Sequence, residues 1–255
     1  GGTNSVTAST GADRITATGG NNTIDSGAGL NVITLNGGTN SVTGGADADV
    51  FVVSNGTNVI NTQAGANTVT LTGGQSTVTD GVGDDSITAS GGVNTINLAQ
   101  GDNRATLNNG TNSVVAGTGN DIFVVAGGTN VILTGEGTNT VTLSGGSSTV
   151  TGGTQADTLT ASGGTNTIDV GEGVNVVTLN QGFNTITAGS GNDIFAVSSG
   201  TNVITAGDGE NTFTLSGGTS TVTTGAGNDT IKEHNGASHM KAGAGINTVT
   251  LSGGT

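Results

Sequence analysis

A glycine that returns every eighteen residues constrains this chain more than any other feature. It stands at Gly2 and at every eighteenth residue as far as Gly236. A second glycine follows nine residues after each of these, from Gly11 onward, and only Asp47 and Gln155 interrupt this second series. A fixed period of about 20–50 residues is the signature of an architecture in which each unit stacks on its neighbours. The chain is therefore one eighteen-residue unit written about fourteen times.

Each half of the unit alternates polar and apolar residues, as in Thr185-Ile186-Thr187. Alternation with period two is typical of a short β-strand with one buried face. The glycines permit the positive φ angles of tight corners. We therefore expect an all-β fold, a parallel β-solenoid (β-roll) with two short strands per 18-residue coil and about 14 coils. Ile and Val would face a thin core and Thr would face outward, and stability would come from contacts between neighbouring coils.

The repeat runs through residues 1–255 without a linker or a change of composition. We therefore expect a single continuous β-solenoid repeat domain. Solenoids need polar capping elements at their ends, and neither end of this sequence departs from the repeat to form one. We accordingly expect the domain to be a segment of a longer protein.

The composition excludes several other classes. The chain has 50 Gly but no Pro, which excludes collagen and polyproline, and its regular apolar positions are not expected of a disordered chain. The formal net charge is −14, with only 4 Lys and Arg residues, which disfavours nucleic acid and anionic lipid as partners. No apolar run has the length that membrane insertion requires.

Two rows of polar residues follow the corners of the predicted coils. The first-half row is mostly Asn, as at Asn4, Asn22 and Asn40, and predicts a ladder of amides that hydrogen-bond from coil to coil and to corner backbone groups. The second-half row alternates strictly between Asp and Asn. Its acidic members are Asp13, Asp49, Asp85, Asp121, Asp157, Asp193 and Asp229.

The acidic corners read GVGDDSITA at 81–89, GTGNDIFVV at 117–125, GSGNDIFAV at 189–197 and GAGNDTIKE at 225–233. These segments resemble the nonapeptide of the repeats-in-toxin (RTX) family, Gly-Gly-x-Gly-x-Asp-x-apolar-x. The resemblance implies a parallel β-roll that holds calcium ions at its corners through Asp carboxylates and backbone carbonyls. This chain departs from the family pattern because an Asn separates each Asp of the row from the next.

Two interpretations of the alternating row follow. In the one we favour, the seven Asp residues are calcium ligands, and one carboxylate per site gives weak binding, of about 10⁻⁴–10⁻³ M. In the other, Asn merely keeps like charges two coils apart. That separation is about 9.6 Å at 4.8 Å per coil, close to the screening length of roughly 8 Å, and no ion is required.

We expect no enzyme activity. The chain has no Cys, and His234 and His239 have no acidic partner at a recognisable catalytic spacing. The pair Asp84–Asp85 lies on a repeat corner, where it looks like a ligand or a solvated edge. We expect instead an extracellular, secreted or cell-surface structural repeat rod of the adhesin, surface-layer or matrix filament type. The alternatives are an ice-binding Thr face and an accessory repeat module of a secreted enzyme.

Outward apolar residues recur in a block of 72 residues and predict self-association. They are Val50 and Val52, Ile122 and Val124, and Ile194 and Ala196. A recurrent apolar patch rimmed by Thr is typical of a docking surface. We therefore expect lateral or end-to-end association of copies of this chain, without nucleic acid and without membrane insertion.

Overall fold

The computed structural model describes residues 2–253 and confirms the predicted fold. The chain forms an all-β, parallel β-solenoid of about 14 turns with about 18 residues per turn. Helices are absent from residues 2–253, and with them any helix long and apolar enough to cross a membrane. The structure divides into two compact units, one of Gly1–Val124 with Gly128–Ile132 and the other of Val125–Gly127 with Leu133–Thr255.

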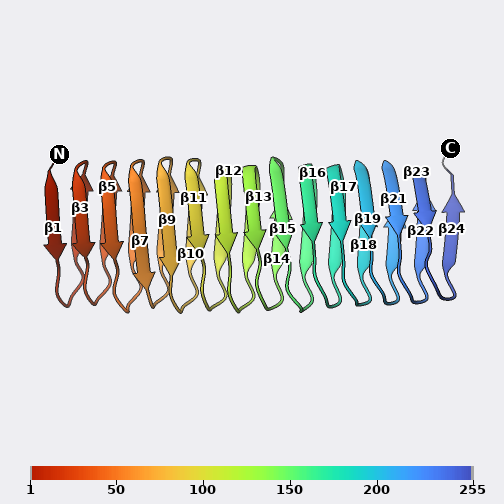
Figure 1. The fold of residues 1–255 in the computed structure, drawn as a ribbon, viewed down its shortest axis with the longest axis horizontal. Coiled ribbons are helices and arrows are strands. Elements are labelled where there is room, and N and C mark those ends of the chain that lie inside the picture. Colours follow the sequence, from red (N-terminus) through yellow and green to blue (C-terminus); the bar gives the residue numbers. More distant parts are fainter. Residues whose placement is uncertain (1, 254–255) are drawn as a thin grey trace. The chain divides into compact units, whose positions relative to one another are not determined.

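Within each unit, the strands of successive coils lie side by side, as Figure 1 shows for β3, β5 and β7. The first unit contains β1 (Thr3–Thr7), β2 (Arg14–Thr18), β3 (Asn21–Asp25), β4 (Val32–Asn36), β5 (Thr39–Thr43), β6 (Val50–Ser54), β7 (Thr57–Gln63), β8 (Thr68–Thr72), β9 (Gln75–Asp80), β10 (Ser86–Ser90), β11 (Val93–Asn97) and β12 (Arg104–Val115). Residues of β13 (Ile122–Leu133) belong to both units.

The second unit repeats the arrangement. It contains β14 (Thr140–Leu143), β15 (Ser147–Thr151), β16 (Thr158–Asp169), β17 (Val176–Thr187), β18 (Ile194–Val197), β19 (Thr201–Thr205), β20 (Thr212–Leu215), β21 (Thr219–Thr223), β22 (Thr230–His234), β23 (Ala237–Lys241) and β24 (Thr248–Ser252). The twelve-residue elements β12, β13, β16 and β17 differ from the expected pair of short strands. In each of these four elements the strand continues through the first-half corner. The corner hydrogen bond itself is common to the coils, as from the N–H of Thr111 to the carbonyl of Gly92 in β12 and from that of Thr57 to Gly38, both at 2.8 Å.

Strand pairing is parallel and joins residues one repeat apart. Val6 of β1 lies beside Ile24 of β3, and Ile24 lies beside Val42 of β5. The other strand column behaves in the same way, with Ile33 of β4 beside Phe51 of β6. An inward residue inside the stack, such as Ile24, therefore lies between its equivalents in the coils before and after it.

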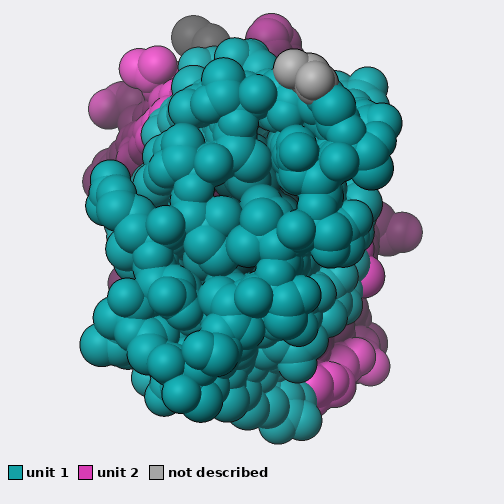
Figure 2. Space-filling view, turned by 90° about the vertical axis from the view of Figure 1, so that its left-hand side faces the viewer, with its two compact units in different colours: residues 1–124, 128–132 teal, residues 125–127, 133–255 magenta. Residues whose placement is uncertain are grey.

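The core lies between the two strand columns of each unit, as the alternation predicts. Ile33, Phe51 and Val69 are completely buried, whereas the residues on either side of them, such as Thr68 beside Val69, face outward. In the second unit the rings of Phe195 and Phe213 stack with centroids 4.5 Å apart. Each such side chain stabilises the fold by about 1.5–3 kcal/mol through burial. Figure 2 looks onto the first coil of the first unit, where Val6 has no described coil on its outer side and is 38% exposed.

The repeating glycine is required because adjacent coils approach too closely for a side chain. At Gly38, φ is 83°, and a Cβ atom would lie 2.4 Å from the carbonyl oxygen of Gly20 in the preceding coil. A contact below about 3 Å with backbone cannot be relieved by a side-chain rotation. The eighteen-residue glycine series is therefore a direct consequence of coil stacking.

Candidate metal centre

The first-half corner carries the predicted asparagine ladder. The Nδ2 group of Asn22 donates to Oδ1 of Asn40 at 2.7 Å and to the carbonyl of Gly19 at 3.0 Å. Asn40 repeats both bonds, to Asn58 at 2.7 Å and to Gly37 at 3.0 Å. These side chains are buried, so each amide hydrogen has an acceptor and the corner backbone is satisfied. This row is structural, as the sequence predicted.

The second-half corner carries the alternating row, and the structure buries its acids. Asp49, Asp85, Asp121, Asp157, Asp193 and Asp229 are buried, whereas Asp13 in the first coil is half-buried. From Asp49 onward, each Asp accepts through Oδ1 the backbone N–H of the Asn one coil earlier. The row is therefore a second continuous ladder.

The ladder keeps the carboxylates of the row apart. Asp85 lies between Asn67, whose N–H it accepts at 2.6 Å, and Asn103, whose Oδ1 accepts the N–H of Asp85 at 3.0 Å. Among the described residues, no three or more His, Cys, Asp or Glu side chains come together as a metal cluster. Any ion held by this row therefore has one carboxylate of the row as its anionic ligand, with backbone carbonyls as its neutral ligands.

The Asn members of this row satisfy their own corners. Nδ2 of Asn31 donates to the carbonyls of Gly27 at 3.1 Å and Gly29 at 2.9 Å. Nδ2 of Asn211 makes the same bonds in the second unit, at 3.2 and 3.3 Å. The two partially positive amide hydrogens thus lie among the carbonyl oxygens of the corner. An Asn corner has an internal substitute for a cation.

The Asp corners lack this substitute, because a carboxylate has no N–H to offer to the same carbonyls. The Oδ2 atoms of Asp85, Asp193 and Asp229 are buried and accept no hydrogen bond. At Asp49 the N–H of Gly45 reaches Oδ2 at 3.0 Å. A buried polar atom without a partner costs about 1–3 kcal/mol, and more when it is charged. These oxygens therefore favour the binding of a proton or a cation.

The pKa values of these acids shift in the direction that burial dictates. Loss of water around the carboxylate raises the pKa of Asp85 from 3.8 to about 7, against the opposing effect of the Asn67 N–H. Burial also raises the pKa of Asp157 and of Asp193. The physical cause is that a charged carboxylate is disfavoured in a medium of low polarity.

The donor set of an Asp corner fits a calcium ion. It consists only of oxygens, from a carboxylate and from backbone carbonyls, which are the ligands that this hard cation takes. Calcium would supply the positive charge that the amide group supplies in an Asn corner. Nitrogen and sulfur ligands are absent from the row, which disfavours zinc.

The acidic pair Asp84–Asp85 is split by the corner. Asp84 is exposed, and its Oδ1 accepts the N–H of Asp102 at 2.8 Å, so it is a solvated edge, whereas Asp85 is buried. Sequence reasoning missed a different acid, Asp80, which is 5% exposed. The sequence did contain a sign of this site, because Asp80 stands at a position where other coils have a small or apolar residue, such as Ala116.

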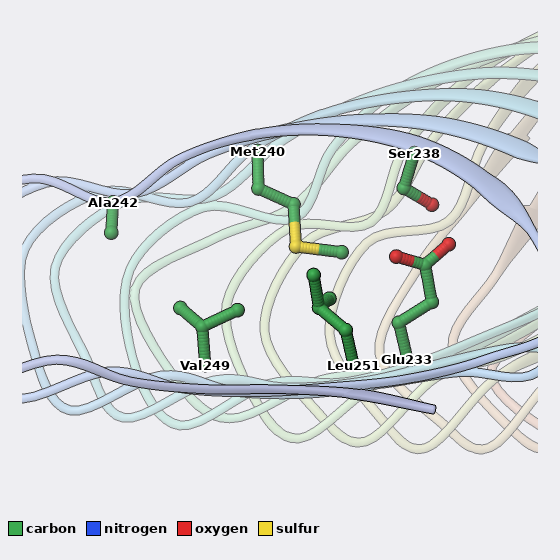
Figure 3. Close-up of a pocket in the computed structure, with 6 residues that line it drawn as sticks. All are labelled: Glu233, Ser238, Met240, Ala242, Val249 and Leu251. Carbon is green, nitrogen blue, oxygen red and sulfur yellow. The ribbon is translucent and has the colours of Figure 1, made fainter. Parts of the chain in front are cut away.

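A second unexpected carboxylate lies at the core-facing position of β22. Glu233 is buried, and its Oε1 has no hydrogen-bond partner. It lines a hollow of about 310 Å³ in the second unit with Ser238, Met240, Ala242, Val249 and Leu251. Figure 3 shows the carboxylate of Glu233 directed toward Ser238, while Met240 and Leu251 approach each other across the hollow.

The fold and these corners define the class of the protein, a parallel β-roll with acidic glycine-rich turns. The profile of the RTX calcium-binding nonapeptide repeat (4 copies) matches residues 1–33, 34–69, 43–78, 70–105, 107–141, 143–177, 171–204 and 197–231. The chain belongs to this family and is a calcium-binding β-roll repeat protein; such proteins are often secreted. Comparison with curated proteins and with solved structures gave no match.

Proposed function

We propose that this chain is an extracellular structural repeat rod of the adhesin, surface-layer or matrix filament type, stabilised by calcium. The ion would be held by the second-half acids, which are Asp13, Asp49, Asp85, Asp121, Asp157, Asp193 and Asp229. The observation that supports the proposal best is the buried Oδ2 of Asp193, which accepts no hydrogen bond. An ion that binds only the folded chain stabilises it by mass action.

The Asn corners limit the number of ions. Asn31 and Asn211 already place amide hydrogens on their glycine carbonyls, so a cation there would have to displace them. We therefore expect calcium at alternate corners, one per two coils, about 9.6 Å apart at 4.8 Å per coil. This spacing separates the chain from a repeat in which every corner carries an acid.

Calcium titration of the folded chain tests this proposal. Thermal unfolding followed by circular dichroism should move to higher temperature with calcium and back with a chelator. Equilibrium dialysis should saturate near one ion per Asp corner, and a magnesium series of equal ionic strength controls for screening. An unfolding curve that does not respond to chelator would favour the alternative in which the row is only a charge-spacing ladder.

Exposed apolar residues support the further proposal that the rods associate with one another. Val50 and Val52 in β6 and Ile122 in β13 face outward on coils 72 residues apart. In the second unit Ile194 of β18 is likewise exposed. A repeated patch of this kind is typical of an interaction surface, and one period of the repeat would set the register between copies.

Sedimentation of lysine variants tests this association. The triple substitution Val52→Lys, Val124→Lys and Ala196→Lys should leave the circular dichroism spectrum unchanged and abolish ordered assembly in calcium. A matched control places three lysines one coil earlier in the same outward row, at Thr34, Thr106 and Thr178. A wild-type chain that stays monomeric at high concentration with calcium would remove this part of the proposal.

The threonine face supports a second candidate, ice binding. Thr70, Thr88 and Thr106 lie side by side in register on β8, β10 and β12. Val52 and Val124 occupy the same position in the coils before Thr70 and after Thr106, so the row of threonines is only three coils long. A thermal-hysteresis measurement distinguishes the candidates, because only an ice-binding face lowers the freezing point below the melting point.

A further inference from the structure

One corner of the first unit contains two inward carboxylates instead of one. Asp80 is the last residue of β9, and Asp85 directly precedes β10. Their exposed fractions are 5% and 2%. The Oδ2 atom of each is buried and accepts no hydrogen bond. Each of the two acids therefore has, inside the same turn, one carboxylate oxygen that no backbone N–H satisfies.

Hydrogen bonds hold the other two carboxylate oxygens in place. Oδ1 of Asp80 accepts the hydroxyl of Thr62 from the preceding coil and the N–H of Gly81 at 3.3 Å. Oδ1 of Asp85 accepts the N–H of Asn67 at 2.6 Å. Both carboxylates are thus anchored at one oxygen, and the second oxygen of each is left for a ligand.

The equivalent glycines of other coils show how close the two positions are. At Gly44 a Cβ atom would lie 2.8 Å from Oδ2 of Asp49, and at Gly152 it would lie 2.9 Å from Oδ2 of Asp157. Asp80 occupies the same place relative to Asp85. Its side chain therefore begins beside the carboxylate of Asp85, and the two carboxyl groups interact with each other both by charge and by a side-chain hydrogen bond.

Among residues 2–253, no basic side chain acts on the charge of this pair. Arg104, the first residue of β12 in the next coil, is exposed, and it pairs with Ser86 of β10. The equivalent of Asp80 in the next coil is Leu98, which is fully buried. Burial raises the pKa of both acids, and the charge of Asp80 adds to the effect on Asp85. Two desolvated like charges in one turn favour a divalent cation over a lone water.

We propose that Asp80 and Asp85, with the hydroxyl oxygen of Thr62 and corner carbonyls, bind one calcium ion more tightly than the single-Asp corners do. The inference rests on the proposed calcium function and adds a ligand outside the nonapeptide acid row. Calcium affinity is tuned by the number of charged ligands and by the rigidity of the site. The second carboxylate and the anchored Oδ1 atoms supply both, so an affinity at least about tenfold higher is expected.

Isothermal titration calorimetry with calcium on the full chain tests the proposal at about pH 8, above the raised pKa of Asp85. The wild-type chain should show one tight ion followed by a weaker class. Asp80→Asn and Asp80→Ala should lose the tight ion and keep the weaker class. Asp169→Asn is the matched control, because Asp169 is exposed at the end of β16 and the change removes the same charge.

Each outcome assigns the result to one of the two proposals. A wild-type chain that binds no calcium would overturn the calcium function and this inference together. A wild-type chain with only one uniform class, or Asp80 variants that retain the tight ion, would overturn this inference alone. A single uniform class of sites is also the result expected if the two acids share a proton instead of binding an ion. Asp80→Ala keeps the test independent of folding defects, since Ala116 and Ala188 occupy the same position in other coils.

Discussion

The substitution Asp193→Asn should stabilise the calcium-free chain, although it removes a proposed calcium ligand. Asp193 is completely buried, its Oδ1 accepts the N–H of Asn175 at 2.8 Å, and its Oδ2 has no partner. One coil later in the same row, Asn211 directs Nδ2 at the carbonyls of Gly207 and Gly209. An amide at position 193 should make the equivalent bonds in its own corner.

The magnitude follows from the atoms involved. Removing an unpartnered buried oxygen relieves about 1–3 kcal/mol, and a new amide hydrogen bond contributes about 1 kcal/mol. Together these two contributions should raise the free energy of unfolding in chelator by about 2–4 kcal/mol. In calcium at about 100 times the dissociation constant, the variant forgoes about 2.7 kcal/mol of binding stabilisation at this corner. The advantage of the variant in chelator should therefore shrink by about 2.7 kcal/mol in calcium.

Urea unfolding followed by circular dichroism measures both states at about pH 8, on the alkaline side because burial raises the pKa of Asp193. Asp169→Asn serves as the control for the loss of one negative charge, because Asp169 is exposed. The reasoning would be refuted by a variant that is less stable than the wild type in chelator. It would also be refuted by calcium stabilising both chains equally, since position 193 would then hold no ion.

Two further predictions concern pH and the glycine series. In chelator, the free energy of unfolding should fall as pH rises from about 4 to about 7. The reason is that burial raises the pKa of Asp85 from its ordinary value of 3.8 to about 7 in the folded chain. The folded state therefore holds the proton more tightly than the unfolded state, and this advantage is lost as the pH rises through the folded pKa. The loss is at most about 4 kcal/mol, saturating calcium should abolish it, and a stability that instead rises over this interval would contradict the burial argument. Gly38→Ala should lower the free energy of unfolding by more than about 2 kcal/mol, since its Cβ would meet the Gly20 carbonyl oxygen at 2.4 Å. Gly37→Ala is the comparison of similar φ with open space around its Cβ, and equal losses at both positions would show that φ, rather than coil contact, determines the cost.

The sequence was sufficient for the architecture, because a solenoid uses the same contacts in every coil. The period of Gly38 and its equivalents predicted the coil length, and the alternation around Ile33 predicted which side chains face the core. The amide ladder through Asn22 and Asn40 was likewise predictable. In a stack of identical turns, residues one repeat apart must lie side by side, so spacing along the chain translates directly into contact.

The state of the second-half corner was decided only by the tertiary structure. The sequence placed Asp85 and Asn67 in one row, but it did not reveal that Nδ2 of Asn67 donates to the Gly65 carbonyl while Oδ2 of Asp85 accepts no hydrogen bond. Nor did it reveal that Asp85 turns away from Asp84 and toward Asp80. The path of the chain through a corner sets which side chains converge there. That path depends on glycine φ angles and on hydrogen bonds to the adjacent coils, neither of which a linear pattern of residue types specifies.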